Sequence, residues 1–165
     1  MATYPVPREI LLEPGGYEDI DAVMAVMDDA FPPCFGERWS RSQVAGVLPL
    51  TGVRMLLAHD GGAAAPIVGF ALWRTVSDES ELLLLAVHTS AQGNGLGRAM
   101  LEDFIEQAQA DGAVRLHLEV RDGNPANQLY ASEGFAVAGR RRDYYRGLEG
   151  ERHDALTYVR TMGAE

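Results

Sequence analysis

Three glycines, Gly93, Gly95 and Gly97, lie between an apolar strand-like run and a helix-like run. Glycine adopts positive φ at no steric cost and lets a ligand approach the backbone closely. The first N–H groups of a helix lack intrahelical partners, and the helix dipole adds partial positive charge there. A glycine-rich turn that leads into a helix therefore suits an anion, above all a pyrophosphate. The alternative is a turn that needs positive φ and binds nothing.

The spacing excludes the two common nucleotide-binding loops. A dinucleotide-binding G-x-G-x-x-G motif needs glycine at position 98 if it starts at Gly93, and at position 100 if it starts at Gly95. These positions hold arginine and methionine. A Walker A loop needs Lys and then Ser or Thr after its last glycine. Gly97 is followed by arginine and alanine, so this motif fails as well.

The full pattern, Gln92-Gly93-Asn94-Gly95-Leu96-Gly97, resembles the Q/R-x-x-G-x-G/A signature of the GNAT superfamily of N-acetyltransferases, and Arg98 follows it directly. The resemblance covers nearly the whole chain, from about residue 9 to 162. It implies that acetyl-CoA is the cosubstrate, with no metal, and that the segment wraps its pyrophosphate. The backbone that the resemblance assigns to the pantetheine arm and thioester is that of Leu85, Ala86 and Val87.

Direct acetyl transfer to an amine makes three chemical demands. The amine must lose a proton, the thioester oxygen must be stabilised as it becomes negative, and the departing thiolate must be protonated or stabilised. The candidates for the base are Glu119, Glu81, Glu79 and His117. Glu119 lies on the polar face of a regular strand, which opens into a cleft or into solvent. Tyr130 lies on the helix that follows, where a tyrosine is either core or a proton donor.

A second resemblance narrows the family. The segments LHLEVRDGNPANQLYASEGF and RRRDYYRGLEGERHDA are similar to those of the RimI-type ribosomal-protein-alanine N-acetyltransferases. The matching positions, in order along the chain, are Glu119, Asn124, Leu129-Tyr130, Gly134-Phe135, Arg141-Arg142, Tyr144-Tyr145 and Asp154-Ala155.

This resemblance implies a role for each of the matching polar residues. Glu119 is the general base, acting through water, and Tyr130 is the general acid that protonates the coenzyme thiolate. Asn124 touches the coenzyme, although it precedes Tyr130 by one residue fewer than is usual in the family. Tyr144 and Tyr145 line the slot for the acceptor peptide, or else they pack at a strand end.

The elements that must position these residues follow from periodicity and from turn chemistry. Apolar residues at three- and four-residue spacing predict a helix over 20–31, which Pro32 ends. Ser40 and Gln43 form a capping-box pattern for a short second helix. The remaining expected elements are strands at 9–12, 53–59, 67–75, 81–88, 114–121, 135–139 and 154–160, and helices at 96–111 and 125–133.

The expected fold is a GNAT-like α/β (α+β) fold with one N-acetyltransferase domain over residues 1–165. A central mixed, mostly antiparallel twisted sheet of about six or seven strands would be flanked by about four helices. The segment over residues 31–41 is longer than the usual connection in the family. The resemblance implies that this segment shapes the acceptor side of the groove, so it bears on which amine the enzyme accepts.

Composition limits the partners and the compartment. The 165 residues are 47% hydrophobic and 23% charged, which is ordinary for a globular domain. A net charge of −10 argues against nucleic acid and favours a basic peptide or a cationic small molecule.

The single cysteine, Cys34, excludes an internal disulfide and fits a reducing cytoplasm. The longest apolar run, Leu82–Val87, is far shorter than the ~20 residues that span a bilayer. The N-terminus lacks the pattern of a signal peptide. A cytoplasmic protein with no membrane partner is expected.

The leading hypothesis from the sequence is acetylation of an N-terminal α-amine, that of the alanine of a small-subunit ribosomal protein. An alternative within enzymes is a GNAT acetyltransferase for a small amine, such as a polyamine or an antibiotic. An alternative from another class is a non-catalytic acyl-CoA sensor, which the presence of both Glu119 and Tyr130 disfavours.

Overall fold

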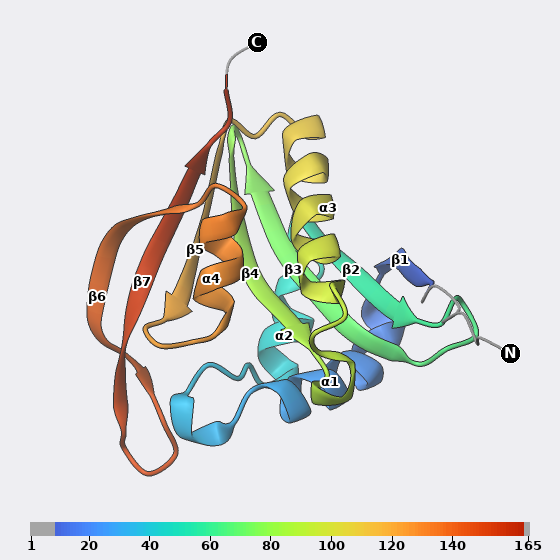
Figure 1. Cartoon of the computed structure of the whole chain (residues 1–165), viewed down its shortest axis with the longest axis horizontal. Coiled ribbons are helices and arrows are strands. Elements are labelled where there is room, and N and C mark those ends of the chain that lie inside the picture. The colour runs from blue at the N-terminus through green and yellow to red at the C-terminus, as the bar shows by residue number, and fades with distance from the viewer. Residues whose placement is uncertain (1–8, 164–165) are drawn as a thin grey trace, which may run out of the picture.

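The computed structural model describes residues 9–163, which form a seven-stranded sheet with the order β1-β2-β3-β4-β5-β7-β6 (Figure 1). Strands β4 and β5 are parallel, and every other neighbouring pair is antiparallel. The expected mixed, mostly antiparallel sheet is confirmed. The strands are β1 (Ile10–Gly15), β2 (Val53–Asp60), β3 (Ile67–Val76), β4 (Glu79–Val87), β5 (Arg115–Arg121), β6 (Ala136–Arg146) and β7 (Arg152–Thr161).

Four α-helices within the described residues cover the two faces of this sheet, also as expected. They are α1 (Ile20–Ala30), α2 (Arg41–Val47), α3 (Leu96–Ala110) and α4 (Ala126–Ser132). Because side chains alternate along a strand, neighbours in β2 belong to different cores. Leu56 packs in the cluster that contains α3, and Leu57 packs in the cluster that contains α1.

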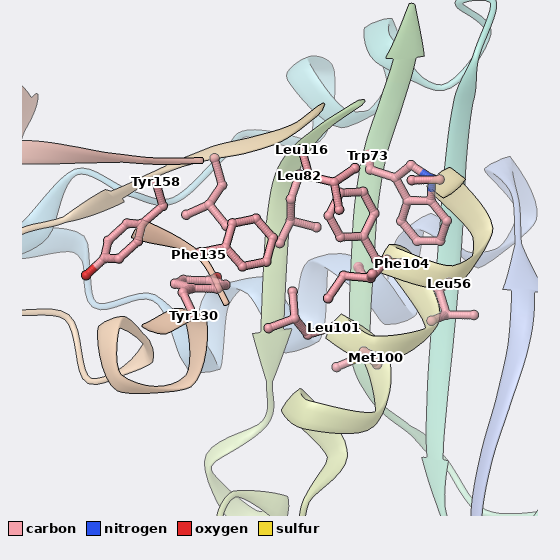
Figure 2. Packing of buried hydrophobic residues seen from close by; sticks show 14 of the residues in the cluster. Leu56, Trp73, Leu82, Met100, Leu101, Phe104, Leu116, Tyr130, Phe135 and Tyr158 are labelled. Atoms are coloured by element: carbon pink, nitrogen blue, oxygen red, sulfur yellow. The ribbon is translucent and has the colours of Figure 1, made fainter. Parts of the chain in front are cut away.

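Aromatic residues fill the core beneath α3 and α4 (Figure 2). The Trp73 and Phe104 rings lie 5.3 Å apart between β3 and α3. Phe135 lies between Leu82 and Tyr130, and Tyr130 faces Tyr158 from β7 (Figure 2). This core therefore joins α4 to the same sheet that α3 covers.

Strand β4 contains a β-bulge in its middle, close to the point where its pairing with β5 ends. The register with β3 shifts so that Leu72 lies opposite Leu84 and Trp73 lies opposite Leu82, which leaves Leu83 extra. Leu82 packs on the α3 side, whereas Leu84 packs on the α1 side. A bulge bends its strand and increases its twist. The pairing of β4 with β5 ends at Leu82 and Leu118, and the two strands then diverge (Figure 1).

The start of α2 confirms the capping box predicted from Ser40 and Gln43. The Ser40 hydroxyl accepts the Gln43 N–H at 3.2 Å, and the Gln43 side chain accepts the Ser40 N–H at 2.8 Å. Before α4, the Asn124 side-chain oxygen accepts the Ala126 N–H at 2.9 Å. Gly134, at φ +84°, ends the helix. These caps satisfy backbone groups that the helices cannot satisfy themselves.

The β6–β7 hairpin is longer than the predicted strands at 135–139 and 154–160. The arginine-rich part of β6 is almost entirely exposed, so it lacks the apolar alternation that would have revealed a strand. The register shifts between Arg141 and Tyr145, and Asp143 adopts φ +54°. This irregularity bends the hairpin beside the end of β5.

The tip of the hairpin touches the segment between α1 and α2. The Leu148 N–H donates to the Pro33 carbonyl at 3.3 Å. A Cβ atom on Gly36 would overlap the Arg146 backbone, and one on Gly147 would overlap the Cys34 carbonyl. Two loops that are distant in sequence therefore meet where only glycine leaves enough room.

Candidate active site

A cavity of about 770 Å³ lies where β4 and β5 diverge. Its walls are the end of β4, the glycine-rich turn, the start of α3, the end of β5, α4 and the segment from Asp29 to Trp39. A volume of this size is typical of a small-molecule or cofactor site. The bulge in β4 is the local cause of the cavity, because it stops the two strands from pairing further.

The glycine-rich turn has the conformation that its composition predicts. Gly93 and Gly95 adopt φ +80° and +84°, and no atom lies within 4 Å of an ideal Cβ at either position. These glycines are therefore required by backbone conformation, and their outer side is open. The first helical hydrogen bond of α3 runs from Ala99 N–H to the Gly95 carbonyl at 3.0 Å. The N–H groups of residues 96–98 precede that bond and are available to an anion.

The side chains of this turn form contacts within the protein that hold the turn in place. Gln92 donates to the Val87 carbonyl at 3.0 Å, and Asn94 donates to the Ala91 carbonyl at 3.3 Å. The Arg98 guanidinium pairs with Glu133 and donates to the Ser132 hydroxyl at 3.0 Å. The Arg98 guanidinium thus links α3 to the end of α4. The backbone N–H of Arg98 is the group of this residue that can bind a pyrophosphate.

Helix α1 anchors the approach to the turn. The Asp29 carboxylate accepts the Thr89 N–H at 2.7 Å and the Thr89 hydroxyl at 3.1 Å. The backbone hydrogen bond from Thr89 is the main cause that lowers the pKa of Asp29 below its ordinary value. Asp29 therefore carries a negative charge at neutral pH and fixes residue 89 relative to α1.

The end of β4 supplies free backbone groups along the cavity. Leu85, Ala86 and Val87 pair with β3 on one side. On the other side the pairing with β5 has already ended at Leu82. All three residues line the cavity. The Val87 carbonyl is already bonded to the Gln92 side chain, and the remaining outward backbone groups can bind an extended amide-containing chain in the way a neighbouring strand would.

Glu119, the predicted base, lies in the cavity wall on β5. Its side chain is only 15% exposed, and Oε1 is 2.9 Å from Arg141 Nε. Its other oxygen, Oε2, is buried and has no hydrogen-bond partner. A buried acceptor without a partner is costly, so Oε2 is suited to receive a donor from a ligand.

The other three candidates for the base lie outside the cavity wall. Glu79 forms an exposed ion pair with Arg115 at 3.1 Å. Glu81 and His117 are paired residues on the hydrogen-bonded part of β4 and β5, before the strands diverge. The divergence of these strands separates Glu119 from the other candidates, although all four looked alike in the sequence.

Tyr130 lines the cavity from α4 and is otherwise buried. Its ring lies 6.2 Å from the Phe135 ring and 6.1 Å from the Tyr158 ring (Figure 2). Burial, with a contribution from the Glu37 charge, raises the pKa of Tyr130 well above its ordinary value. The phenol is therefore protonated at neutral pH, as a general acid must be.

Asn124 also lies in the cavity wall, but its side chain is engaged within the protein. Its amide nitrogen donates to Glu37 Oε2 at 2.8 Å, and its oxygen caps α4 through Ala126. The coenzyme contact expected for Asn124 stays a prediction. What the structure shows is an asparagine that ties the start of α4 to Glu37.

Sequence reasoning missed the buried ion pair between Glu37 and Arg121. Their side chains are 9% and 11% exposed. The Arg121 guanidinium lies 3.7 Å from the Phe35 ring centroid. All three residues line the cavity. Glu37 belongs to an irregular loop with no periodic pattern, and Arg121 continues a polar strand face, so nothing in the sequence pairs them.

The two adjacent tyrosines of β6 differ in position. Tyr145 lines the cavity, whereas Tyr144 is half exposed and lies next to it, with the rings 5.0 Å apart and nearly perpendicular. Burial and then the Glu119 charge raise the pKa of Tyr144. Burial and then the Glu37 charge raise the pKa of Tyr145 further.

Residues 25–148 match the family described as an acetyltransferase (GNAT) domain. The chain belongs to the GNAT family of acetyltransferases. The match includes the diverging strands, the glycine-rich turn and the segment from Asp29 to Trp39 that together form the cavity. As a member of this family the chain is an N-acetyltransferase.

Curated relatives within the family are N-terminal acetyltransferases. The chain is 39% identical to the ribosomal protein bS18-alanine N-acetyltransferase of Escherichia coli over 119 residues, which are 72% of this chain and 77% of that protein. It is 34% identical over 147 residues to the N-alpha-acetyltransferase RimI of Mycobacterium tuberculosis, covering 88% and 84%. The match to the Haemophilus influenzae enzyme spans 62% of that protein and 54% of this chain.

Solved structures confirm the GNAT fold. The crystal structure of the Escherichia coli ribosomal-protein-S18-alanine N-acetyltransferase matches with a TM-score of 0.82 and 30% identity, over 95% of this chain and 96% of that one. The NAA60 structure from Arabidopsis thaliana in complex with acetyl-CoA matches with a TM-score of 0.82 over 94% and 100% of the chains. At 17% identity, the second likeness shows the fold alone.

Two further observations concern partners. Within residues 9–163, no group of three or more His, Cys, Asp or Glu side chains could hold a metal ion. In the same part of the chain, no helix is long and apolar enough to cross a membrane.

Proposed function

We propose that this enzyme transfers the acetyl group of acetyl-CoA to the N-terminal α-amine of a protein, with the N-terminal alanine of a small-subunit ribosomal protein as the acceptor. The observation that carries the proposal is the cavity at the β4–β5 divergence, which contains both a carboxylate with a free oxygen, Glu119, and a buried phenol, Tyr130. The Escherichia coli ribosomal protein bS18-alanine N-acetyltransferase supports the choice of acceptor, and the N-alpha-acetyltransferase RimI of Mycobacterium tuberculosis supports an α-amine.

The cavity fits acetyl-CoA in three places. The open glycine-rich turn and the start of α3 would hold the pyrophosphate through residues 92–98. The backbone of Leu85 to Val87 would hold the pantetheine arm and orient the thioester. Tyr130, on the facing helix, would lie at the sulfur end. The coenzyme contact of Asn124 is part of the same proposal.

The proposed reaction needs two proton carriers. Glu119 takes one proton from the acceptor ammonium, through a water molecule, and leaves a neutral amine. The amine nitrogen attacks the thioester carbon, so that a C–N bond forms and the C–S bond breaks. The Tyr130 hydroxyl gives its proton to the leaving sulfur and regains one from the acetylated nitrogen. No covalent intermediate on the enzyme is required.

An α-amine suits this pair of residues better than a lysine side chain does. The ordinary pKa of an α-amine is ~7.7–8.0, against ~10.4 for lysine, so a carboxylate can deprotonate the former more readily. The Tyr145 side chain and the loop that contains Glu37 would border the slot for the first residues of the peptide. A ribosomal acceptor and acetyl-CoA both imply that the enzyme works in the cytoplasm.

The test is incubation with acetyl-CoA and short peptides that begin with Ala-Arg or Ser-Arg, followed by mass measurement and fragmentation. Acetylation at the α-amine of the alanine peptide is expected. Polyamines and an aminoglycoside serve as the competing acceptors. If a small amine gains an acetyl group and no peptide does, the proposed function is wrong.

A further inference from the structure

The two side chains of the ion pair between Arg141 and Glu119 differ in how far they are exposed to solvent. The Glu119 side chain is 15% exposed, whereas the Arg141 side chain is 60% exposed. A carboxylate that is mostly buried depends on its cationic partner, because an unpaired buried charge is costly. The mostly hydrated guanidinium can leave at little cost, since exposed ion pairs contribute little to stability.

Strand register brings the two residues together. Glu119 is paired with Thr157 of β7, and Thr157 is paired with Gly139 of β6. Arg141 is two residues beyond Gly139, so the Arg141 side chain lies on the face of β6 that a side chain at position 139 would share. Gly139 has no side chain to occupy the place across from Glu119. Arg141 therefore reaches back over β7 to the carboxylate.

The guanidinium of Arg141 occupies a site that is suited to cations in general. Its central carbon lies 5.4 Å from the ring centroid of Tyr144. A carboxylate beside an aromatic face attracts a cation through both charge and the ring quadrupole. Tyr145, which touches Tyr144, continues this site into the cavity.

We propose that Arg141 is a resident counter-ion of Glu119, and that the α-ammonium group of the acceptor, together with the water that relays its proton, displaces it on binding. This inference rests on the proposed function. The exchange replaces one cation with another, so the buried carboxylate keeps a partner throughout. No covalent bond forms or breaks in this step. Arg141 thereby competes with the acceptor and sets the affinity for it.

The preceding arginine, Arg140, is held by other acids. Arg140 pairs with Asp122 at 2.7 Å and with Asp154 at 2.9 Å. Arg142 follows in the same exposed part of β6. Since Arg142 carries the same charge next to Arg141, it provides a matched control for any long-range effect of charge on the acceptor.

The experiment compares steady-state kinetics of the wild type, Arg141→Gln, Arg141→Lys and Arg142→Gln with the Ala-Arg peptide at saturating acetyl-CoA. Arg141→Gln is expected to lower the KM for the peptide about two- to fivefold, the range of an exposed ion pair, and to change kcat less. Arg141→Lys and Arg142→Gln are expected to keep the KM of the wild type.

Two other results would overturn the inference. A higher KM or a large loss of kcat in Arg141→Gln would mean that the arginine holds Glu119 in position. An effect seen with Ala-Arg but absent with an Ala-Ala peptide would assign the exchange to the side chain of the second residue instead of the α-ammonium. A wild type that acetylates no peptide would instead refute the proposed function itself.

Discussion

At the scale of single residues, the two proposed proton carriers, Glu119 and Tyr130, have different surroundings. Glu119 pairs with Arg141, lies in the cavity wall and has one oxygen free. Tyr130 is buried between aromatic rings, and burial is the main cause that raises its pKa. A carboxylate and a protonated phenol in one cavity can act as base and acid in one reaction.

Replacing Tyr130 by phenylalanine tests the role of its hydroxyl. The ring contacts with Phe135 and Tyr158 remain, so the fold and the affinity for the coenzyme should change little. We expect kcat to fall about 10²-fold or more, the usual contribution of a positioned acid. Single-turnover kinetics and coenzyme binding by calorimetry separate the two effects. A large loss of coenzyme affinity would show that Tyr130 is structural.

Replacing Glu119 by glutamine tests the base. The shape of the side chain is kept and its charge is removed, so we expect kcat/KM for the peptide to fall about 10²- to 10⁴-fold. The loss should be greatest at low pH, where most of the acceptor amine is protonated. Glu81→Gln is the matched control, because that carboxylate lies on the paired part of β4 and β5. Equal effects of the two substitutions would remove Glu119 from this role.

At the scale of elements, small local features place the secondary structure around the cavity. The bulge at Leu83 turns β4 away from β5, and the caps at Ser40 and Asn124 define where α2 and α4 begin. On the far edge of the sheet, His59 joins β1, β2 and the connection after β2. Its ring nitrogens lie 2.7 Å from the Ala65 carbonyl oxygen and 2.7 Å from Glu13 Oε1.

The His59 contacts predict a pH-dependent stability. Both ring nitrogens face acceptors, so the protonated ring satisfies both contacts. Burial lowers the pKa of His59, but the hydrogen bonds to Ala65 and Glu13 outweigh it, and the pKa is raised overall. The stabilisation is therefore complete below about pH 6.5, the ordinary pKa, and is lost as the pH rises through the raised value.

The measurement is the free energy of unfolding of the wild type and of His59→Gln by urea between about pH 5.5 and 9. We expect the difference between the two proteins to shrink as the pH rises. Glu13→Gln should make the dependence shallower, because it removes one partner of the imidazolium. A difference that is constant over the whole range would show that His59 does not change its charge.

At the scale of the whole molecule, the segment between α1 and α2 ties the two halves of the sheet together. Its Glu37 pairs with Arg121 at the end of β5 and with Asn124 at the start of α4. Its Gly36 packs against the backbone of the β6–β7 hairpin. One loop thus contacts every element on the β5 side of the cavity, and it borders the place where the acceptor would enter.

A double-mutant cycle tests how far stability depends on this tie. Glu37→Gln leaves Arg121 as an uncompensated buried cation and should cost about 3–5 kcal/mol of unfolding free energy. Arg121→Met should also destabilise, and the double variant should lose less than the sum of the two. Urea unfolding of the four proteins measures the coupling. Strict additivity would mean that Glu37 and Arg121 stabilise the fold independently.

Local patterns in the sequence were sufficient for most of the fold. Apolar periodicity located the helices and the inner strands, and Ser40 with Gln43 located a cap, because these depend on residues within a few positions of each other. The spacing of Gly93, Gly95 and Gly97 set the conformation of the turn for the same reason. The exposed, arginine-rich part of β6 carries no such pattern, and its length was underestimated.

The sequence by itself determined the family, the glycine-rich turn and the short set of candidate bases. Only the tertiary structure separated Glu119 from Glu79, Glu81 and His117, since that choice depends on where β4 and β5 stop pairing. Only the tertiary structure also showed that Glu37 forms an ion pair with Arg121 and that Arg141 forms one with Glu119. Partners so far apart along the chain leave no local pattern, because their contact arises from the packing of several elements at once.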